Sequence, residues 1–428
     1  MLDIRMIREN PDIVRANLRK RGSEEKLKLL EKLIKDDALW RKLLSETNEL
    51  RKQKNIITIK VASLKKEGKK ADKELKEANS LDKKISDNEE KVKQLEEGTR
   101  NSLMRIPNII HDSVPIGKDD SENVELRRWG KIPEFGFKIR DHIELGLMND
   151  FFDIERAAKV SGARFYYLKN DLVELDLALQ QFGLAELKER GFKIVEPPFM
   201  IRRKPYEGVT DLGDFEDVMY KVEGEDLYLI ATSEHPLVSM FMDEIIEEEK
   251  LPIKLAGISP CFRKEAGSHG RDTKGIFRVH QFNKVEQVIF CRPEDSWKMH
   301  EDLIKNTEHI FQKLELPYKI VDICTGDIGT IAAKKYDLEV WLPGQNNFRE
   351  AASCSNCTDY QARRLNIRMR RKAGDKPEIL HTLNNTGIAT GRAMIAIMEN
   401  YQQEDGSIVI PKALRKHMDG REVIPARK

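Results

Sequence analysis

The sequence predicts an α+β protein: an antiparallel sheet flanked by helices, with an N-terminal antiparallel α-helical coiled-coil arm. An apolar heptad repeat runs through a segment rich in Lys, Glu and Leu, from Glu24 to Glu97. Short apolar runs separated by tight turns follow it, with amphipathic helical segments between them. We therefore expect two domains, a helical hairpin over residues 1–105 and a mixed domain over residues 106–428.

In the arm, Leu43, Leu50, Ile57 and Leu64 recur every seven residues, and a second repeat begins after Gly68. A turn at Lys66–Lys69 would bring the two stripes together as an antiparallel pair. About 40 helical residues at 1.5 Å each make an arm roughly 60 Å long.

Basic residues gather near the predicted tip of this hairpin. A charge run is often only a solvated helix face, so a coiled-coil surface and a nucleic-acid contact both remain open from the pattern alone. The candidate contacts are Arg51, Lys52, Lys54, Lys60, Lys65, Lys66, Lys69 and Lys70.

The charges of the whole chain nearly cancel. There are 75 Lys and Arg against 73 Asp and Glu in 428 residues, a formal net charge of +2. This excludes a bulk polycation, so any nucleic-acid contact must come from local clusters. Five cysteines, an odd number, favour a reducing compartment, and no apolar run reaches the ~18 residues of a membrane span. We expect a cytoplasmic protein with no membrane contact.

After residue 105, the runs Lys193–Val195 and Val285–Phe290 read as strands, and Leu175–Arg190 reads as a helix. Turns such as Gly224–Asp226 favour hairpins over βαβ crossovers, so we expect an antiparallel sheet. No Rossmann or P-loop glycine pattern is present in the sequence.

The first chemical motif spans Pro260–Phe282 and reads as a strand, a basic glycine-rich loop and a returning strand. We place Arg263 and Glu265 on one face of the first strand, with Arg278 beginning the second. Phe282 and Glu286 would share that face. Each pair could be a structural salt bridge, but together they suggest a nucleotide held by two arginines and an aromatic ring.

Two further clusters favour phosphate chemistry. Glu350 and Ser353 offer the hard oxygen ligands that Mg²⁺ uses when it bridges phosphates. Arg392 stands at the start of a predicted helix that continues to Tyr401, where an anion would be favoured. Cys354 and Cys357 form a single C-x-x-C, a weak zinc signal, and we expect no zinc.

These residues resemble the motifs of the class II aminoacyl-tRNA synthetases. Phe262-Arg263-x-Glu265 resembles motif 2, Gly391-Arg392 motif 3, and Gly191-Phe192 with Pro198 motif 1. Within that class the chain resembles the seryl-tRNA synthetases over essentially its whole length. The markers are Thr232-Ser233-Glu234, the runs Phe262–Gln287 and Glu350–Arg364, the end Met398–Gln402, and the helical arm.

The resemblance implies residue roles. Arg263, Arg392 and Glu350 would be catalytic, and Glu350 and Ser353 would bind Mg²⁺. The implied L-serine site comprises Thr232, Ser233, Glu234, Arg263, Glu286 and Thr386. The implied ATP site comprises Arg263, Lys264, Glu265, Arg278, Val279, Phe282, Glu350, Ala351, Ala352, Ser353 and Arg392. Asn385-Thr386 departs from the Gly-Ser of many relatives but keeps the hydroxyl.

The implied activity is formation of seryl-adenylate from L-serine and ATP, followed by transfer of serine to the 3′ end of tRNA(Ser). Charging of tRNA(Sec) stays open. The resemblance also implies a homodimer through the motif 1 region. A non-catalytic tRNA-binding paralogue is a competing hypothesis, against which Arg263, Glu265, Glu350 and Arg392 argue. A ligase that acts on a carrier protein would lack the arm.

Overall fold

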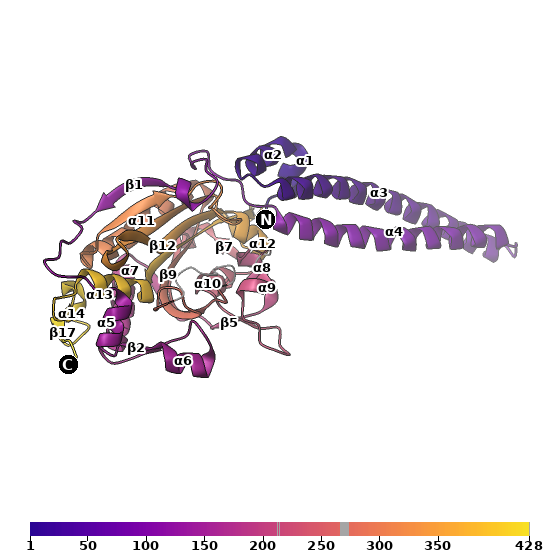
Figure 1. Ribbon diagram of the computed structural model, residues 1–428. Helices are drawn as coiled ribbons and strands as arrows, with labels where there is room; N and C mark the ends of the chain where they lie inside the picture. The colour runs from indigo at the N-terminus through magenta and orange to yellow at the C-terminus, as the bar shows by residue number, and fades with distance from the viewer. Residues whose placement is uncertain (212, 214, 266–273, 428) are drawn as a thin grey trace. The chain divides into compact units, whose positions relative to one another are not determined.

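The computed structural model describes residues 1–211, 213, 215–265 and 274–427 (Figure 1). The chain divides into two compact units. One unit is Leu2–Pro107, and the other is Asn108–Lys428 together with Met1. No helix in the described ranges is long and apolar enough to cross a membrane.

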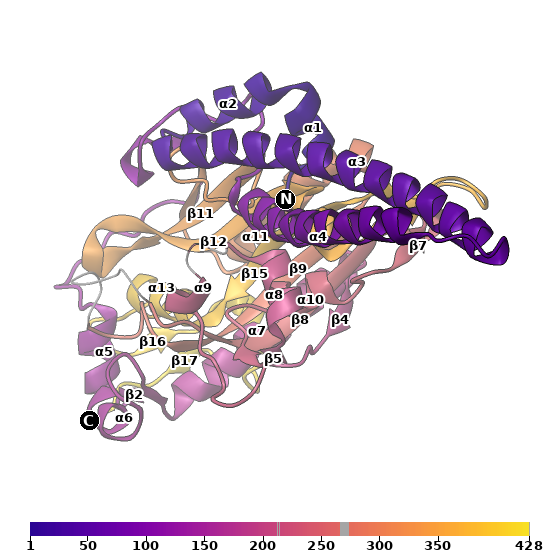
Figure 2. The ribbon, with the colours of Figure 1, turned by 90° about the vertical axis from the view of Figure 1, so that its right-hand side faces the viewer.

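The first unit is the predicted helical hairpin. Its two long helices lie side by side in Figures 1 and 2 and are joined through Gly68, whose φ of +68° suits glycine. The predicted stripe of Leu43, Leu50, Ile57 and Leu64 is half-buried, and Val61, Leu81 and Ile85 of the same two helices are buried. The helices of this unit are α1 (Ile4–Glu9), α2 (Pro11–Lys20), α3 (Glu24–Lys66) and α4 (Asp72–Arg105).

The second unit contains the predicted sheet. It has eight strands in the order β1-β10-β11-β12-β15-β9-β8-β4. Neighbouring strands are antiparallel, except that β4 runs parallel to β8 at one edge. The strands are β1 (Val124–Trp129), β4 (Lys193–Val195), β8 (Ile253–Phe262), β9 (Gln281–Cys291), β10 (Tyr318–Asp322), β11 (Lys334–Leu342), β12 (Asn347–Thr358) and β15 (His381–Ala389).

Helices pack against both faces of this sheet. Val285 and Ile289 of β9 pack in the largest apolar cluster with residues of α7, α11 and α13. The alternate residues Val288 and Phe290 belong to a second cluster, with residues of α8, α10 and α12. The helices of this unit are α5 (His142–Met148), α6 (Ile154–Ser161), α7 (Asp171–Glu189), α8 (Arg203–Val209), α9 (Phe215–Val218), α10 (Glu234–Ser239), α11 (Ser296–Lys313), α12 (Tyr360–Leu365), α13 (Thr390–Asn400) and α14 (Lys412–Arg415).

Small strands complete the second unit at its margins. They are β2 (Phe152–Asp153), β3 (Tyr167–Leu168), β5 (Met200–Ile201), β6 (Tyr228–Leu229), β7 (Ile245–Glu247), β13 (Arg368–Arg370), β14 (Glu378–Ile379), β16 (Ile408–Val409) and β17 (Val423–Ile424). β13 pairs with β14 and, in parallel, with β7.

Candidate active site and basic arm

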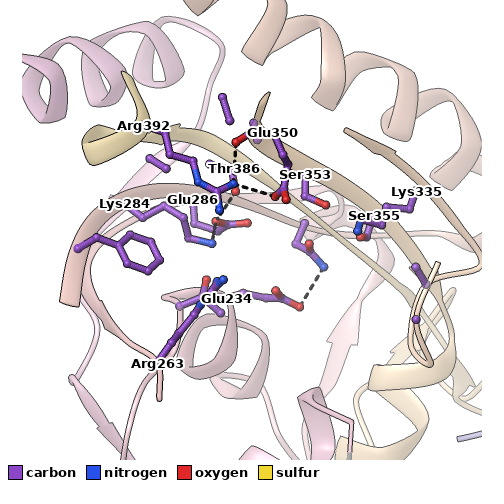
Figure 3. Close-up of a pocket in the computed structure, with 18 of the residues that line it drawn as sticks. Glu234, Arg263, Lys284, Glu286, Lys335, Glu350, Ser353, Ser355, Thr386 and Arg392 are labelled. Atoms are coloured by element: carbon purple, nitrogen blue, oxygen red, sulfur yellow. Dashed lines mark hydrogen bonds and ion pairs between the residues drawn. The ribbon is translucent and has the colours of Figure 1, made fainter. Parts of the chain in front are cut away.

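A cavity of about 460 Å³ opens on the second unit, lined by residues of β9, β11, β12 and β15 and of the start of α13 (Figure 3). It brings together most of the predicted site. The predicted site residues that line the cavity are Thr232, Glu234, Arg263, Glu265, Arg278, Val279, Phe282, Glu286, Glu350, Ala351, Ala352, Ser353, Thr386 and Arg392.

Strand alternation positions the side chains of β9. Phe282, Lys284 and Glu286 line the cavity, whereas Val285 packs in the apolar cluster against the helices. The structure thus confirms the prediction that Phe282 and Glu286 lie on the same face of the strand. Residues 266–273 of the glycine-rich loop between the motif 2 strands lie outside the described residues.

Glu286 is 1% exposed and forms an ion pair with Lys284, which is 6% exposed. Lys284 Nζ and Thr386 Oγ1 approach the same carboxylate oxygen, Oε2, with Thr386 donating at 3.4 Å (Figure 3). Asn385, next to Thr386, donates from Nδ2 to the Leu303 carbonyl of α11 at 2.6 Å. This bond fixes β15 from its other face, so the Thr386 hydroxyl is held toward the cavity.

Glu234 is the first residue of α10 and is half-buried. Its Oε1 accepts from Gln361 Nε2 at 2.9 Å and from Asn384 Nδ2 at 3.0 Å. Burial, followed by the nearby negative charge of Glu286, raises the pKa of Glu234 to about 7. One end of the cavity therefore has two carboxylates, one of which titrates near neutral pH.

Arg263 stands where β8 ends. Its guanidinium carbon lies 5.2 Å from the centre of the Phe282 ring, and Nε donates to the Ala231 carbonyl at 3.2 Å. Its backbone N–H donates to the His280 carbonyl at 2.9 Å. The arginine is therefore anchored on two neighbouring segments and faces the cavity.

The prediction that Arg263 and Glu265 share a strand face, and that Arg278 begins the returning strand, is wrong. β8 ends at Phe262 and β9 begins at Gln281. Glu265 has φ of +49°, a left-handed conformation that takes the chain out of the ladder. Glu265 and Arg278 still meet, because Arg278 Nη1 donates to Glu265 Oε2 at 2.8 Å across the loop.

Arg392 is the third residue of α13 and reaches back over β12. Its Nη1 lies 3.1 Å from Glu350 Oε1 and donates to the Glu350 carbonyl at 2.7 Å. Arg392 lowers the pKa of Glu350 to about 2. The guanidinium carbon of Arg392 lies 5.1 Å from the Phe277 ring centre, with that of Arg349 at 4.2 Å. Glu350 is thus an ionised carboxylate paired with the Arg392 guanidinium.

Ser353, on the same strand, lies opposite Asp337 of β11. Asp337 is buried, and burial raises its pKa to about 7. The Ser353 side chain hydrogen-bonds to Asp337, which also forms a 3.7 Å ion pair with Lys335. Ser353 is therefore oriented by a buried partner beneath the cavity.

Two predicted site residues do not line the cavity. Ser233 is fully buried, and Lys264 follows Arg263 with its backbone N–H bound to the Val218 carbonyl at 3.0 Å. Sequence reasoning in turn missed Lys284, Lys335, Phe277, Asn384, Thr210 and Asp211, all of which line it. Lys284 had a usable signal: it stands two residues before Glu286 on a predicted strand. Thr210 and Asp211 had none, because only the tertiary fold brings them there.

The five cysteines are all buried and free. Cys354 Sγ lies 3.8 Å from the His300 carbonyl, and Cys357 Sγ accepts from Asn384 Nδ2 at 3.5 Å. Burial raises the pKa of both thiols well above the ordinary value. In the described ranges, no group of three or more His, Cys, Asp or Glu side chains could hold a metal ion.

Most candidate cations of the arm have acidic partners within the arm. Arg51 pairs with Glu89 at 2.7 Å, and Lys60 with Glu74 at 3.1 Å, across the two helices. Further pairs are Lys54–Asp82, Lys52–Glu49 at 3.5 Å and Lys69–Glu67 at 2.8 Å. No such pair is found among the described residues for Lys65, Lys66 or Lys70, which lie at the tip.

Comparison with known families agrees with this architecture. Residues 219–401 match the tRNA synthetase class II core domain (G, H, P, S and T), and residues 1–110 match the seryl-tRNA synthetase N-terminal domain. The antiparallel sheet and the arginine-lined cavity are thus those of a class II tRNA synthetase.

Individual relatives narrow the assignment. The serine–tRNA ligase of Methanospirillum hungatei is 56% identical over 425 residues, 99% of this chain and 100% of the relative. The serine–tRNA ligase of Thermococcus onnurineus is 53% identical, covering 100% of this chain and 98% of the relative. A crystal structure of Pyrococcus horikoshii seryl-tRNA synthetase complexed with ATP covers both chains fully, with a TM-score of 0.94 and 50% identity. A serine–tRNA ligase of Naegleria fowleri in complex with AMP matches with a TM-score of 0.89 and 35% identity, over 100% of this chain and 99% of that one. The chain belongs to the seryl-tRNA synthetase family, which confirms the predicted resemblance and fold class.

Proposed function

We propose that this chain activates L-serine with ATP in the cavity lined by residues of β9, β11, β12 and β15. A serine carboxylate oxygen attacks the α-phosphorus of ATP, the bond to the bridging oxygen breaks, and pyrophosphate leaves. The 3′-terminal ribose hydroxyl of tRNA(Ser) then attacks the seryl carbonyl and releases AMP. The observation that carries the proposal is one cavity that joins an arginine-rich end to a carboxylate-rich end.

The arginine-rich end suits ATP. Arg263 would hold the α-phosphate, Arg278 the terminal phosphates and Arg392 the γ-phosphate. Phe282 and Arg392 would enclose adenine, while Glu265 would accept from its amino group. Because Glu265 and Arg278 bind each other at 2.8 Å, we expect ATP to separate this pair. Val279, Ala351 and Ala352 supply close wall contacts, and Lys264 would act through its backbone.

Glu350 and Ser353 fit Mg²⁺. An ionised carboxylate and an oriented hydroxyl are hard oxygen ligands, and Mg²⁺ ordinarily takes one or two protein ligands plus water and substrate phosphates. When bound, Mg²⁺ would neutralise phosphate charge. Arg263 and Arg392 would do the same from the protein side, and no side-chain nucleophile is needed.

The carboxylate-rich end suits serine. Arg263 would face the serine carboxylate, and Glu234, Glu286 and Thr386 would face its ammonium and hydroxyl groups, with Thr232 close by. Ser233 would contribute through the packing of α10. A site that binds a hydroxyl rejects alanine, since its polar groups would otherwise be left unpaired.

Serine-dependent exchange of pyrophosphate into ATP tests this assignment. We expect exchange with serine and a far smaller rate with alanine or threonine. Exchange driven by another amino acid, with none from serine, would contradict it.

For the second substrate, we propose that the arm binds tRNA(Ser) by shape and backbone charge; charging of tRNA(Sec) stays open.

We also propose a homodimer through the motif 1 region. Ile194, Phe199 and Met200 there are 46%, 36% and 46% exposed, and β4 is an edge strand. Light scattering should give a dimer mass, and I194E/F199E should give the monomer mass. A cytoplasmic location stays a prediction from cysteine usage.

A further inference from the structure

The serine end of the cavity contains a buried cation that none of the roles above uses. Lys284 is 6% exposed and stands two residues before Glu286 on β9, so both side chains emerge on the same face (Figure 3). A buried ammonium is costly unless it is paired, and its partner is Glu286. The pair therefore belongs to the built site.

The two carboxylate oxygens of Glu286 differ in their contacts. Both Lys284 Nζ and the Thr386 hydroxyl approach Oε2. Lys284 makes its closest approach at Oε2, and no hydrogen bond to Oε1 is found across the described ranges. The carboxylate is thus held by one oxygen, and the other remains available to a ligand in the cavity.

The charges at this end also balance. Glu234 and Glu286 can provide two negative charges, and Arg263 and Lys284 provide two positive ones. An amino-acid zwitterion adds one of each, with its carboxylate toward Arg263 and its ammonium toward the carboxylates. A second cation on the ligand would find no uncompensated negative charge.

We infer that Lys284 determines side-chain selectivity in this pocket, because it orients Glu286 toward a neutral hydroxyl and takes the place that a cationic substrate side chain would need. The inference rests on the proposed serine site. Lys284 is a positioning residue, since it acts on the ligand through Glu286.

Replacing Lys284 by methionine tests the inference through a gain of binding, which a merely damaged fold cannot produce. The probe is 2,3-diaminopropionate, which has an amine in place of the serine hydroxyl, used as a competitor of serine in pyrophosphate exchange. In K284M we expect the KM for serine to rise about tenfold and the inhibition constant of the probe to fall about tenfold. The KM for ATP should change less than twofold.

K284R should keep the wild-type ratio of the two constants. K319M is the matched control, because Lys319 of β10 pairs with Glu339 at 2.9 Å in the same sheet but away from the cavity. If K284M fails to fold by circular dichroism, K284Q replaces it with the same expectations. An unchanged ratio in a folded variant overturns the inference. A wild-type enzyme that does not activate serine would instead overturn the proposed function.

Discussion

The pKa of Glu234 makes serine binding depend on pH. Its value of about 7 arises from burial and from Glu286, opposed by Lys284 and Arg263. A raised carboxyl pKa means that the proton is held below about pH 7 and lost above it. Only the ionised form attracts the serine ammonium. We expect the KM for serine to fall as the pH rises through about 7 and then to level off.

Steady-state exchange from pH 6 to 8.5 would measure this dependence. E234Q, which cannot ionise, should have a higher KM with no step in this range. A step of the same size in E234Q would assign the titration to another group.

Arg392 both holds Glu350 in place and faces the cavity. It fixes Glu350 through two contacts, at 3.1 and 2.7 Å, and presents its guanidinium to the cavity. Loss of a preorganised charge that faces a transferring phosphoryl group commonly costs about 10²–10³ in rate. We expect R392A to lower kcat/KM for ATP by that order while leaving the melting temperature nearly unchanged.

Pyrophosphate exchange with ATP varied would measure the effect. R127A is the control, because Arg127 of β1 pairs with Glu308 of α11 at 2.7 Å and neither residue lines the cavity. Equal losses in both variants would mean that the effect is structural.

The sequence predicted most of these residues because their types and spacing are chemically informative. Arg263, Glu286, Glu350 and Arg392 each stand in a motif with a recognisable partner. The sequence predicted that Arg278 lies near Glu265 but not that the two side chains bind each other. Their contact depends on the left-handed backbone conformation of Glu265, which no local sequence pattern predicts. Thr210 and Asp211 required the fold itself.

At the scale of elements, β8 holds α10 at contact distance through Gly257. A Cβ there would lie 2.5 Å from Leu237 Cδ1 and 2.8 Å from Ser233 Oγ. Because α10 begins with Glu234, displacement of this helix moves a serine contact. We expect G257A to cost about 1–3 kcal/mol in unfolding free energy. The KM for serine should rise and that for ATP should not.

Chemical denaturation and exchange kinetics would separate the two effects. Gly391 offers a control for stability, because the nearest atom that a Cβ there would meet among the described residues outside its own helix is the Ile276 carbonyl oxygen, at 4.0 Å. G391A should be far less destabilising. Equal destabilisation would show that helix displacement is not the cause.

In the arm, ion pairing separates the candidate cations. Arg51, Lys54 and Lys60 already have acidic partners on α4, so their charges are partly compensated. We expect K65A/K66A/K70A to weaken tRNA(Ser) binding more than R51A/K54A/K60A. Each lost phosphate contact should reduce the slope of log K against log salt by roughly one.

Filter binding from 50 to 200 mM salt would measure this. The R51A/K54A/K60A variant serves as the charge-matched control. A larger loss in that control than in the tip variant would contradict the expectation.

The heptad repeat predicted the two helices of the arm and the turn between them, because coiled-coil periodicity is local and strong. It could not give the cross-helix ion pairs, since they depend on the register of α3 against α4. The order of the eight strands in the sheet could not be predicted from the sequence either. Antiparallel pairing was foreseen from the turns, but the parallel edge between β4 and β8 comes from long-range topology.

At the scale of the whole molecule, the division at Pro107 predicts that the two chemical steps can be separated. The cavity residues all belong to the second unit. Shortening the arm should therefore leave serine-dependent exchange within about twofold of wild type and reduce transfer to tRNA(Ser) by roughly 10²-fold or more, if several phosphate contacts are lost.

The register decides where to cut. Because Arg51 faces Glu89 and Lys60 faces Glu74, removing Arg51–Lys73 alone would leave residues 74–88 of α4 without a partner. Replacing residues 51–88 by a short glycine-containing turn shortens α3 and α4 by matching lengths. Aminoacylation and exchange assays on the same preparation would measure both steps, and persistent transfer at moderate salt would contradict an arm that binds tRNA.

The burial of all five cysteines has a practical consequence. A maleimide dye added to the native enzyme should find almost no thiol to react with. A single cysteine placed at exposed Ala62, on the distal part of α3, would then take the label alone. Fluorescence from that one site would report tRNA docking in real time, with the natural cysteines left in place.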